Sequence, residues 1–183
     1  VRSGYDEIVA ISSLDKFLVV FLRTSIVIYS GADDPSGSPG LEIAKIIQGV
    51  GCIERDSIQQ IGNELYFLSA TGVRALRQVI ESENNLELSD VSYLVRRELV
   101  DSIRNVTTHK VRSAYSPEEA LYLLFASDGK VWAFDMHVVS SAGSNIRITQ
   151  FLETNWSVAY NHEGVLYLAK EGTVGKYLGY LDA

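Results

Sequence analysis

The hydrophobic and polar positions of this chain repeat one arrangement three times. In each copy an apolar run opening with Leu-Tyr is followed by a short polar turn containing Gly and then by a second apolar run, over residues 64–76, 120–134 and 165–177. Runs rich in β-branched and aromatic residues around a polar turn are typical of β-hairpins. The Leu-Tyr pairs begin at 65, 121 and 166, so they are 56 and 45 residues apart. Repeats at this spacing indicate the blades of a β-propeller.

The N-terminal segment shows a related pattern. It predicts strands over 8–11, 17–22 and 25–29, and an outer strand over 42–47 that follows the stretch 31–40, rich in Gly and Pro. Clusters of Gly, Pro, Asp and Ser mark exposed loops. We interpret 31–40 as a loop within one blade, and the alternative is a linker between domains.

The remaining blades follow from the same pattern. Their first strands are predicted over 57–61, 110–115 and 156–160, and 147–151 is a further outer strand, whereas the fourth blade has none. The sequence therefore predicts an all-β, propeller-like fold of about four antiparallel blades, the last incomplete, in a single domain over 1–183. The predicted hairpins are centred on Thr24, Thr71, Asp128 and Glu171. Because a closed ring usually needs four to eight complete blades, closure is not expected within this chain.

One segment departs from the β pattern. Residues 89–105 place Val91, Leu94, Val95 and Leu99 at helical spacing on one face, with Ser89 or Asp90 as a plausible N-cap. The spacing predicts an α-helix inserted between the second and third hairpins, the one long helix of the chain, with those four apolar residues facing inward.

Composition narrows the function classes. The 183 residues are 46% hydrophobic and carry a net charge of −7, which argues against a domain that clamps phosphates. No apolar run approaches the roughly 20 residues of a membrane span. The single cysteine, Cys52, cannot form an intrachain disulfide, and its small or apolar neighbours predict a buried, inert thiol. The chain opens at Val1 without an initiator Met and ends close behind an apolar strand, so we expect a fragment of a larger protein.

Candidate chemical groups are few. His109, His137 and His162 lack metal-ligand spacing, and the adjacent acids Asp33 and Asp34 lie in the Gly- and Pro-rich loop, where carboxylates are usually solvated. We expect no catalytic residue, no cofactor and no metal site.

Two sets of side chains remain candidates for binding. Trp132 and Trp156 either stack on sugar rings or pack between blades. The arginines of the predicted helix, Arg96, Arg97 and Arg104, are candidate interface residues that could meet a phosphate backbone or a partner, and a solvated helix face is the alternative.

With this order of elements, the chain resembles the tail nozzle, or tail tubular protein B, and related virion stabilisation proteins of short-tailed bacteriophages. The matching stretches are 51–58, 62–73, 88–95, 129–135, 156–158 and 172–177, which together cover roughly residues 50 to 180. The order of these stretches carries the resemblance, and residues 1–49 add a compatible blade.

The resemblance implies a structural, non-enzymatic part of the phage tail, made in the bacterial cytoplasm and located in the virion. Its implied partners are the portal, the adaptor and further copies of itself in a homo-oligomer, with DNA passing nearby without tight binding and no membrane span. One alternative is a carbohydrate-binding or glycan-cleaving β-propeller. Another is a scaffold of the WD-repeat type, against which the missing Trp-Asp dipeptides count.

Overall fold

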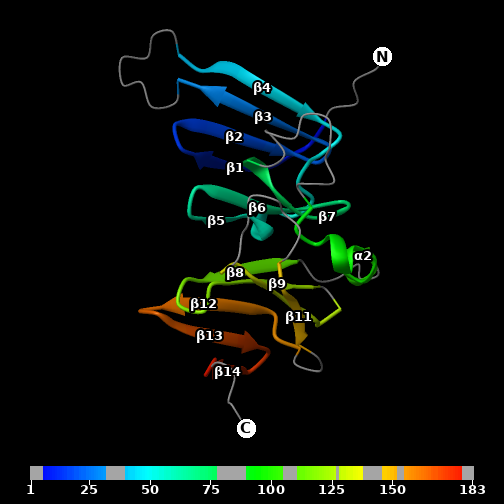
Figure 1. The fold of residues 1–183 in the computed structure, drawn as a ribbon, viewed down its shortest axis with the longest axis vertical. Helices are drawn as coiled ribbons and strands as arrows, with labels where there is room; N and C mark the ends of the chain where they lie inside the picture. The colour runs from blue at the N-terminus through cyan, green and yellow to red at the C-terminus, as the bar shows by residue number, and fades with distance from the viewer. Residues whose placement is uncertain are drawn as a thin grey trace.

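The computed structural model describes residues 6–31, 40–77, 90–104, 111–126, 128–137, 146–151 and 155–178. In these ranges the chain is mostly β, with one short α-helix and four antiparallel sheets. The sheets follow one another in chain order along the long axis of the molecule (Figure 1). No barrel or ring closes within the described ranges. No helix in them is both long and apolar enough to cross a bilayer.

The first sheet contains four strands in the order β1-β2-β3-β4. They are β1 (Ile8–Leu14), β2 (Phe17–Leu22), β3 (Ser25–Ser30) and β4 (Glu42–Gln48). The predicted hairpin at Thr24 and the predicted outer strand are confirmed. Of the predicted loop 31–40, residues 32–39 lie outside the described ranges.

The second sheet has three strands, β5 (Gln59–Ile61), β6 (Glu64–Ser69) and β7 (Gly72–Ala75), preceded by the 3-10 helix η1 (Arg55–Ser57). The hairpin at Thr71 is confirmed. The strand that follows the turn at Thr71 was expected to continue to residues 79 and 80, which lie outside the described ranges. In the structure this strand, β7, ends at Ala75.

The third and fourth sheets follow the same plan. The third, in the order β11-β10-β9-β8, contains β8 (Arg112–Ser116), β9 (Leu121–Phe125), β10 (Val131–Asp135) and β11 (Ile148–Phe151). The fourth contains β12 (Val158–His162), β13 (Val165–Lys170) and β14 (Thr173–Lys176). Their antiparallel pairing confirms the hairpins around Asp128 and Glu171, and the fourth sheet has the three strands expected of it.

Three apolar clusters lie between the four sheets, and each cluster joins one consecutive pair of sheets. Alternation along a strand sends successive side chains to opposite faces. On β6, Leu65 and Phe67 pack toward the first sheet, whereas Tyr66 and Leu68 pack toward the third. On β9, Tyr122 and Leu124 join the cluster with the second sheet, and Leu123 and Phe125 join the cluster with the fourth. The two middle sheets are therefore covered on both faces.

The helical insertion is shorter than predicted. The 3-10 helix η2 (Tyr93–Val95) leads into α2 (Arg96–Arg104), and Ser89 and Asn105 lie outside the described residues. Val91 and Leu99 are buried and Val95 is partly buried, as expected. The prediction for Leu94 is wrong, because its side chain is 71% exposed. The 3-10 turn explains the error: its i, i+3 geometry rotates Leu94 away from the face that Leu99 occupies.

Candidate functional site

The candidate site lies where the helical insertion meets the second sheet. Among the described residues no regular strand pairs with the outer edge of β7, and the segment 90–92 lies there through a single bridge between Arg74 and Asp90. The backbone N–H of Val91 donates to the carbonyl of Val73 at 3.0 Å. The N–H of Val73 donates in turn to the hydroxyl of Ser92 at 3.0 Å. These three residues thus provide hydrogen-bond partners for the edge of β7.

A buried carboxylate fixes the start of the helix. Asp90 is 2% exposed, and its Oδ1 accepts hydrogen bonds from the backbone N–H and the hydroxyl of Ser92, at 2.9 and 2.7 Å. Its Oδ2 accepts from Nε of Arg96 at 2.6 Å. Asp90, one of the two residues predicted as the N-cap of the helix, instead binds Ser92 two residues ahead and Arg96 at the first position of α2. A buried charge needs such partners.

Gly72 makes this close approach possible. Its φ is +132°, a conformation that side-chain-bearing residues rarely adopt, and a Cβ there would collide with Oγ of Ser92 and approach Oδ1 of Asp90 at 3.2 Å. The turn glycine of the second hairpin therefore serves the docking of segment 90–92 as well as the turn itself.

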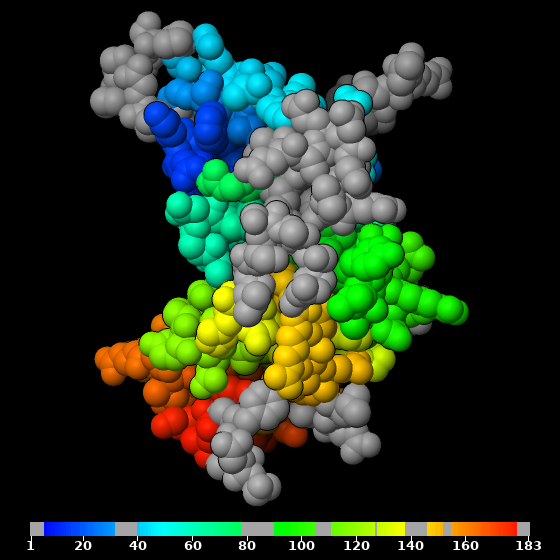
Figure 2. Space-filling view, in the orientation of Figure 1, coloured from blue at the N-terminus to red at the C-terminus, as the bar shows by residue number. Residues whose placement is uncertain are grey.

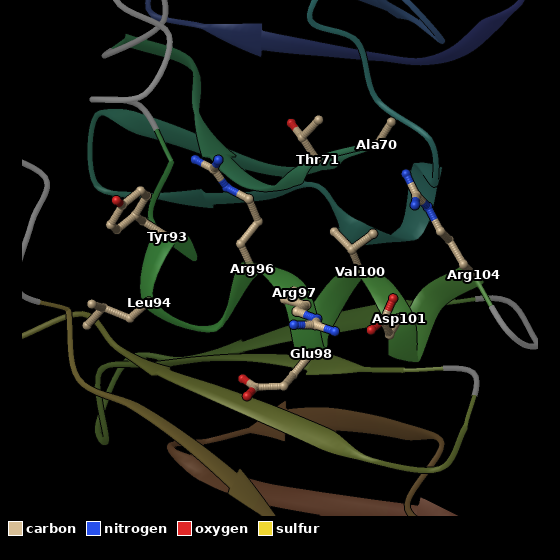
Figure 3. A pocket seen from close by; sticks show the side chains of 10 residues that line it. All are labelled: Ala70, Thr71, Tyr93, Leu94, Arg96, Arg97, Glu98, Val100, Asp101 and Arg104. Atoms are coloured by element: carbon tan, nitrogen blue, oxygen red, sulfur yellow. The ribbon is translucent and has the colours of Figure 1, made fainter.

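The exposed side of α2 and the β6–β7 turn enclose an open pocket of about 540 Å³ (Figure 3). α2 lies at the side of the stack of sheets, where its surface is open to solvent (Figure 2). The lining residues come from the turn, from η2 and from α2: Ala70, Thr71, Tyr93, Leu94, Arg96, Arg97, Glu98, Val100, Asp101 and Arg104.

The pocket combines cations with exposed apolar side chains. All three arginines predicted as interface residues line it, so the structure brings Arg96, Arg97 and Arg104 together. Tyr93 is 61% exposed, and the guanidinium of Arg96 lies over its ring at 5.1 Å from the centroid. Exposed tyrosine and arginine are the residue types enriched in protein interfaces.

The three arginines differ in what holds them. Arg96 is bound to Asp90, and its Nη2 is buried with no hydrogen-bond partner in the part of the chain that the structure describes. Arg97 and Arg104 are exposed, and no ion pair within the described ranges engages either one. Glu98 and Asp101 line the same pocket, so its charge is mixed.

A second contact attaches α2 to the third sheet. The hydroxyl of Ser102 donates to Oδ2 of Asp128, and Nζ of Lys130 lies 2.8 Å from the same oxygen. Partial burial alone would raise the pKa of Asp128, but the hydrogen bonds from Lys130 and Ser102 outweigh it and hold that pKa below its usual value. The helix is therefore held by a carboxylate at each side, Asp90 and Asp128.

The tryptophans and the cysteine serve packing. Trp132 is buried in the cluster between the second and third sheets, and Trp156 packs against the cluster between the third and fourth. Nζ of Lys170 lies 5.0 Å from the Trp156 ring centroid. Cys52 is fully buried, as predicted, and burial raises the pKa of its thiol to about 11. Neither tryptophan lines the pocket beside α2.

The histidines stay apart. His137 lies beside Asp135, with Nδ1 at 2.9 Å from Oδ1, and His162 ends β12. His109, Asp33 and Asp34 lie outside the described residues. Within the described ranges no group of three or more His, Cys, Asp or Glu side chains could hold a metal ion.

Sequence reasoning missed the pocket because it placed Leu94 in the core and gave Tyr93 no role. The signal that could have revealed it is Asp90-Val-Ser92, an Asx-type turn directly before the helical spacing begins. Such a turn starts the helix later and leaves Tyr93 and Leu94 outside the regular periodicity.

No protein-family model matches the chain, and no curated protein matches it at a significant level.

Proposed function

We propose that this chain is a structural, non-enzymatic component of the tail of a short-tailed bacteriophage. The observation that carries the proposal is the α2 surface, where Tyr93 and Leu94 are exposed beside Arg97 and Arg104. Exposed aromatic, aliphatic and guanidinium groups around a concavity have the composition of a protein-docking site. The resemblance of residues 50 to 180 to tail nozzle proteins supplies the biological setting, namely the virion, after synthesis in the bacterial cytoplasm.

The proposed architecture is that of a propeller segment, which forms a single domain over 1–183. Four consecutive antiparallel sheets, each joined to the next through an apolar cluster, support the assignment of each sheet as one blade. In this proposal the second blade replaces its outer strand by segment 90–92 and α2.

The α2 surface would bind another tail subunit, either the adaptor, the portal or a further copy of the chain in a homo-oligomer. Arg97 and Arg104 would meet carboxylates of the partner, and Tyr93 and Leu94 would fill an apolar depression on it. DNA would pass nearby without tight binding, because a chain of net charge −7 offers few phosphate contacts.

The test is binding of the purified chain to the adaptor and portal proteins of the same phage. The double variant Arg97→Glu with Arg104→Glu should lose binding, since it places like charges against an acidic partner. Arg112→Glu is the matched control, because Arg112 is also exposed but lies on β8 and does not line the pocket. Unchanged binding in the double variant would refute the role of this surface.

Two further outcomes would refute the tail assignment itself. One is submicromolar, salt-sensitive binding of duplex DNA together with no affinity for any virion protein. The other is saturable binding of a glycan that depends on carboxylate side chains, which would favour the carbohydrate-binding alternative.

A further inference from the structure

The outer face of the first sheet is apolar and open. The register of the four strands aligns Ile11, Val20, Val27 and Ile46 in one row across β1, β2, β3 and β4. These four side chains point away from the cluster that joins the first sheet to the second, because their neighbours Ala10, Val19, Ile26 and Ile47 belong to that cluster. Ile11 is 62% exposed and Ile46 is 51% exposed.

A second row lies beside the first. Ser13, Leu18, Tyr29 and Ile43 are aligned in the same way, and neither row contains a charged side chain. A solvated face of an antiparallel sheet normally alternates to polar residues. Contiguous uncharged apolar surface of this kind marks an interaction site.

The corresponding face at the other end of the stack is different. On the fourth sheet the outward rows are Val158, Ala169 and Val174, and Tyr160, Tyr167 and Lys176. His162 pairs with Val165 at the margin of the same face. Pairing the first sheet with the fourth sheet of another copy would bury the Lys176 ammonium against aliphatic groups, at a substantial desolvation cost. Pairing two first sheets would bury no charge.

We propose that the outer face of the first sheet binds the same face of a second copy of this chain, in a two-fold symmetric dimer. The contact would resemble the three apolar interfaces between successive sheets inside the chain. Both copies would contribute the same rows of apolar side chains, one side chain from each strand. This proposal stands on the face itself and does not depend on the phage-tail function or on the α2 surface.

The size of the face is adequate for a specific contact. Four strands about 4.8 Å apart and about 20 Å long span on the order of 400 Å² in projection. The accessible area of a corrugated sheet exceeds its projection, so two such faces bury close to the roughly 1,000 Å² that a specific interface needs.

The test is the molar mass of the full chain in solution, measured by light scattering and sedimentation over a range of concentrations. The wild-type chain should show a concentration-dependent species of twice its 20.2 kDa mass. Ile46→Lys should raise the dimer dissociation constant by about tenfold or more, because it places a lysine from each copy within the contact. Ile11→Lys should do the same, and it replaces Ile46→Lys if that variant does not fold.

Val174→Lys is the matched control. Val174 is an exposed aliphatic residue on an edge strand, as Ile46 is, but it lies on the fourth sheet. It should leave the dissociation constant unchanged. The proposal is overturned if the wild-type chain stays monomeric at high concentration, if the dimer persists unchanged in both lysine variants of the first sheet, or if Val174→Lys is the variant that dissociates it. A monomer would mean that a different protein, or no protein, covers this face.

Discussion

The first and second sheets are built from similar apolar runs but differ in how much of each run is buried. β2 reads Phe-Leu-Val-Val-Phe-Leu and fully buries only Val19 and Phe21, whereas β6 reads Glu-Leu-Tyr-Phe-Leu-Ser and buries every residue after the first. β2 is the more apolar strand and the less buried one. The difference lies in the neighbours, because β6 has a sheet on each side and β2 has one.

This contrast indicates that the open face of the first sheet is suited to being covered by a further layer. A continuous apolar run predicts a strand covered on both faces. β6 fulfils that expectation inside the chain. β2 does not, and the uncharged rows on its outer side are what a second covering layer would bury.

The largest expected effect is a difference in stability between alanine substitutions in the second sheet and in the first. Leu68→Ala on β6 should cost about 2–5 kcal/mol, because Leu68 is fully buried between the second and third sheets. Leu18→Ala on the outer side of β2 should cost about 1 kcal/mol or less in the monomer, since its side chain is only partly buried. Chemical denaturation of both variants at low protein concentration measures the difference.

Protein concentration sharpens this test. If the first sheet is covered by a second copy, the cost of Leu18→Ala should grow as concentration rises through the dimer range, while that of Leu68→Ala should not. If Leu18→Ala cost as much stability as Leu68→Ala at every concentration, the two sheets would be equally buried, and this result would contradict the difference between them.

Two glycines extend the comparison to the turns. Gly72 and Gly49 both have positive φ, at +132° and +82°, but a Cβ on Gly72 would collide with Ser92 and a Cβ on Gly49 would meet nothing within 4 Å. Gly49→Ala should cost about 1 kcal/mol, from backbone strain alone. Gly72→Ala should cost about 2–4 kcal/mol, because it adds displacement of the segment that closes the second sheet. Thermal unfolding of the two variants ranks them, and an equal loss would refute the role assigned to Gly72.

The pH dependence of stability should differ between two carboxylates that are buried to different extents, Asp128 and Asp6. Asp128 is partly buried, and hydrogen bonds from Lys130 and Ser102 lower its pKa despite the opposing effect of burial. A group whose pKa is lowered on folding stabilises the protein above its unfolded pKa of about 3.9, and this stability is lost as pH falls through the folded value.

Asp128→Asn should therefore reduce the loss of stability between about pH 5 and pH 3. Asp6, beside the first sheet, also has a lowered pKa: its slight burial would raise that pKa, but hydrogen bonds from Ser25 and Thr24 lower it. Its position near solvent makes the effect of Asp6→Asn smaller. Denaturant midpoints at the two pH values measure both, and a larger effect at Asp6 would contradict this ranking.

Much of the β architecture could be predicted from sequence because hairpins are local. The turns at Thr24, Thr71 and Glu171 lie between apolar runs of the right length, and the pairing follows from the turn. Whether Ile46 or Leu68 would be exposed could not be predicted, since both lie in apolar strands. Their burial depends on which sheet packs against which, and that is a property of the whole stack.

The candidate site was harder to predict for a different reason. The three arginines were identified because a helical face of charged residues is visible in the sequence. The pocket also needs Tyr93 and Leu94, whose exposure depends on a 3-10 turn that begins after Asp90 binds Ser92. That hydrogen bond forms where segment 90–92 pairs with β7. A prediction from helical spacing alone cannot include this contact, so it starts the helix one turn too early.

The smallest expected effect tests this correction directly. Leu94→Asp should change stability by about 0.5 kcal/mol or less, because a 71% exposed side chain gives up little apolar contact and the new carboxylate remains solvated. Leu99→Asp, five residues on and fully buried, should prevent stable folding or cost several kcal/mol, since it places an unpaired charge between α2 and the sheets. Chemical denaturation measures both changes in stability. A large loss of stability in Leu94→Asp would contradict this correction and support the longer helix that the spacing alone predicts. Partner binding should respond in the opposite order: Leu94→Asp should weaken binding to a tail subunit while the fold stays intact, which separates a docking residue from a core residue at neighbouring positions of one helical segment.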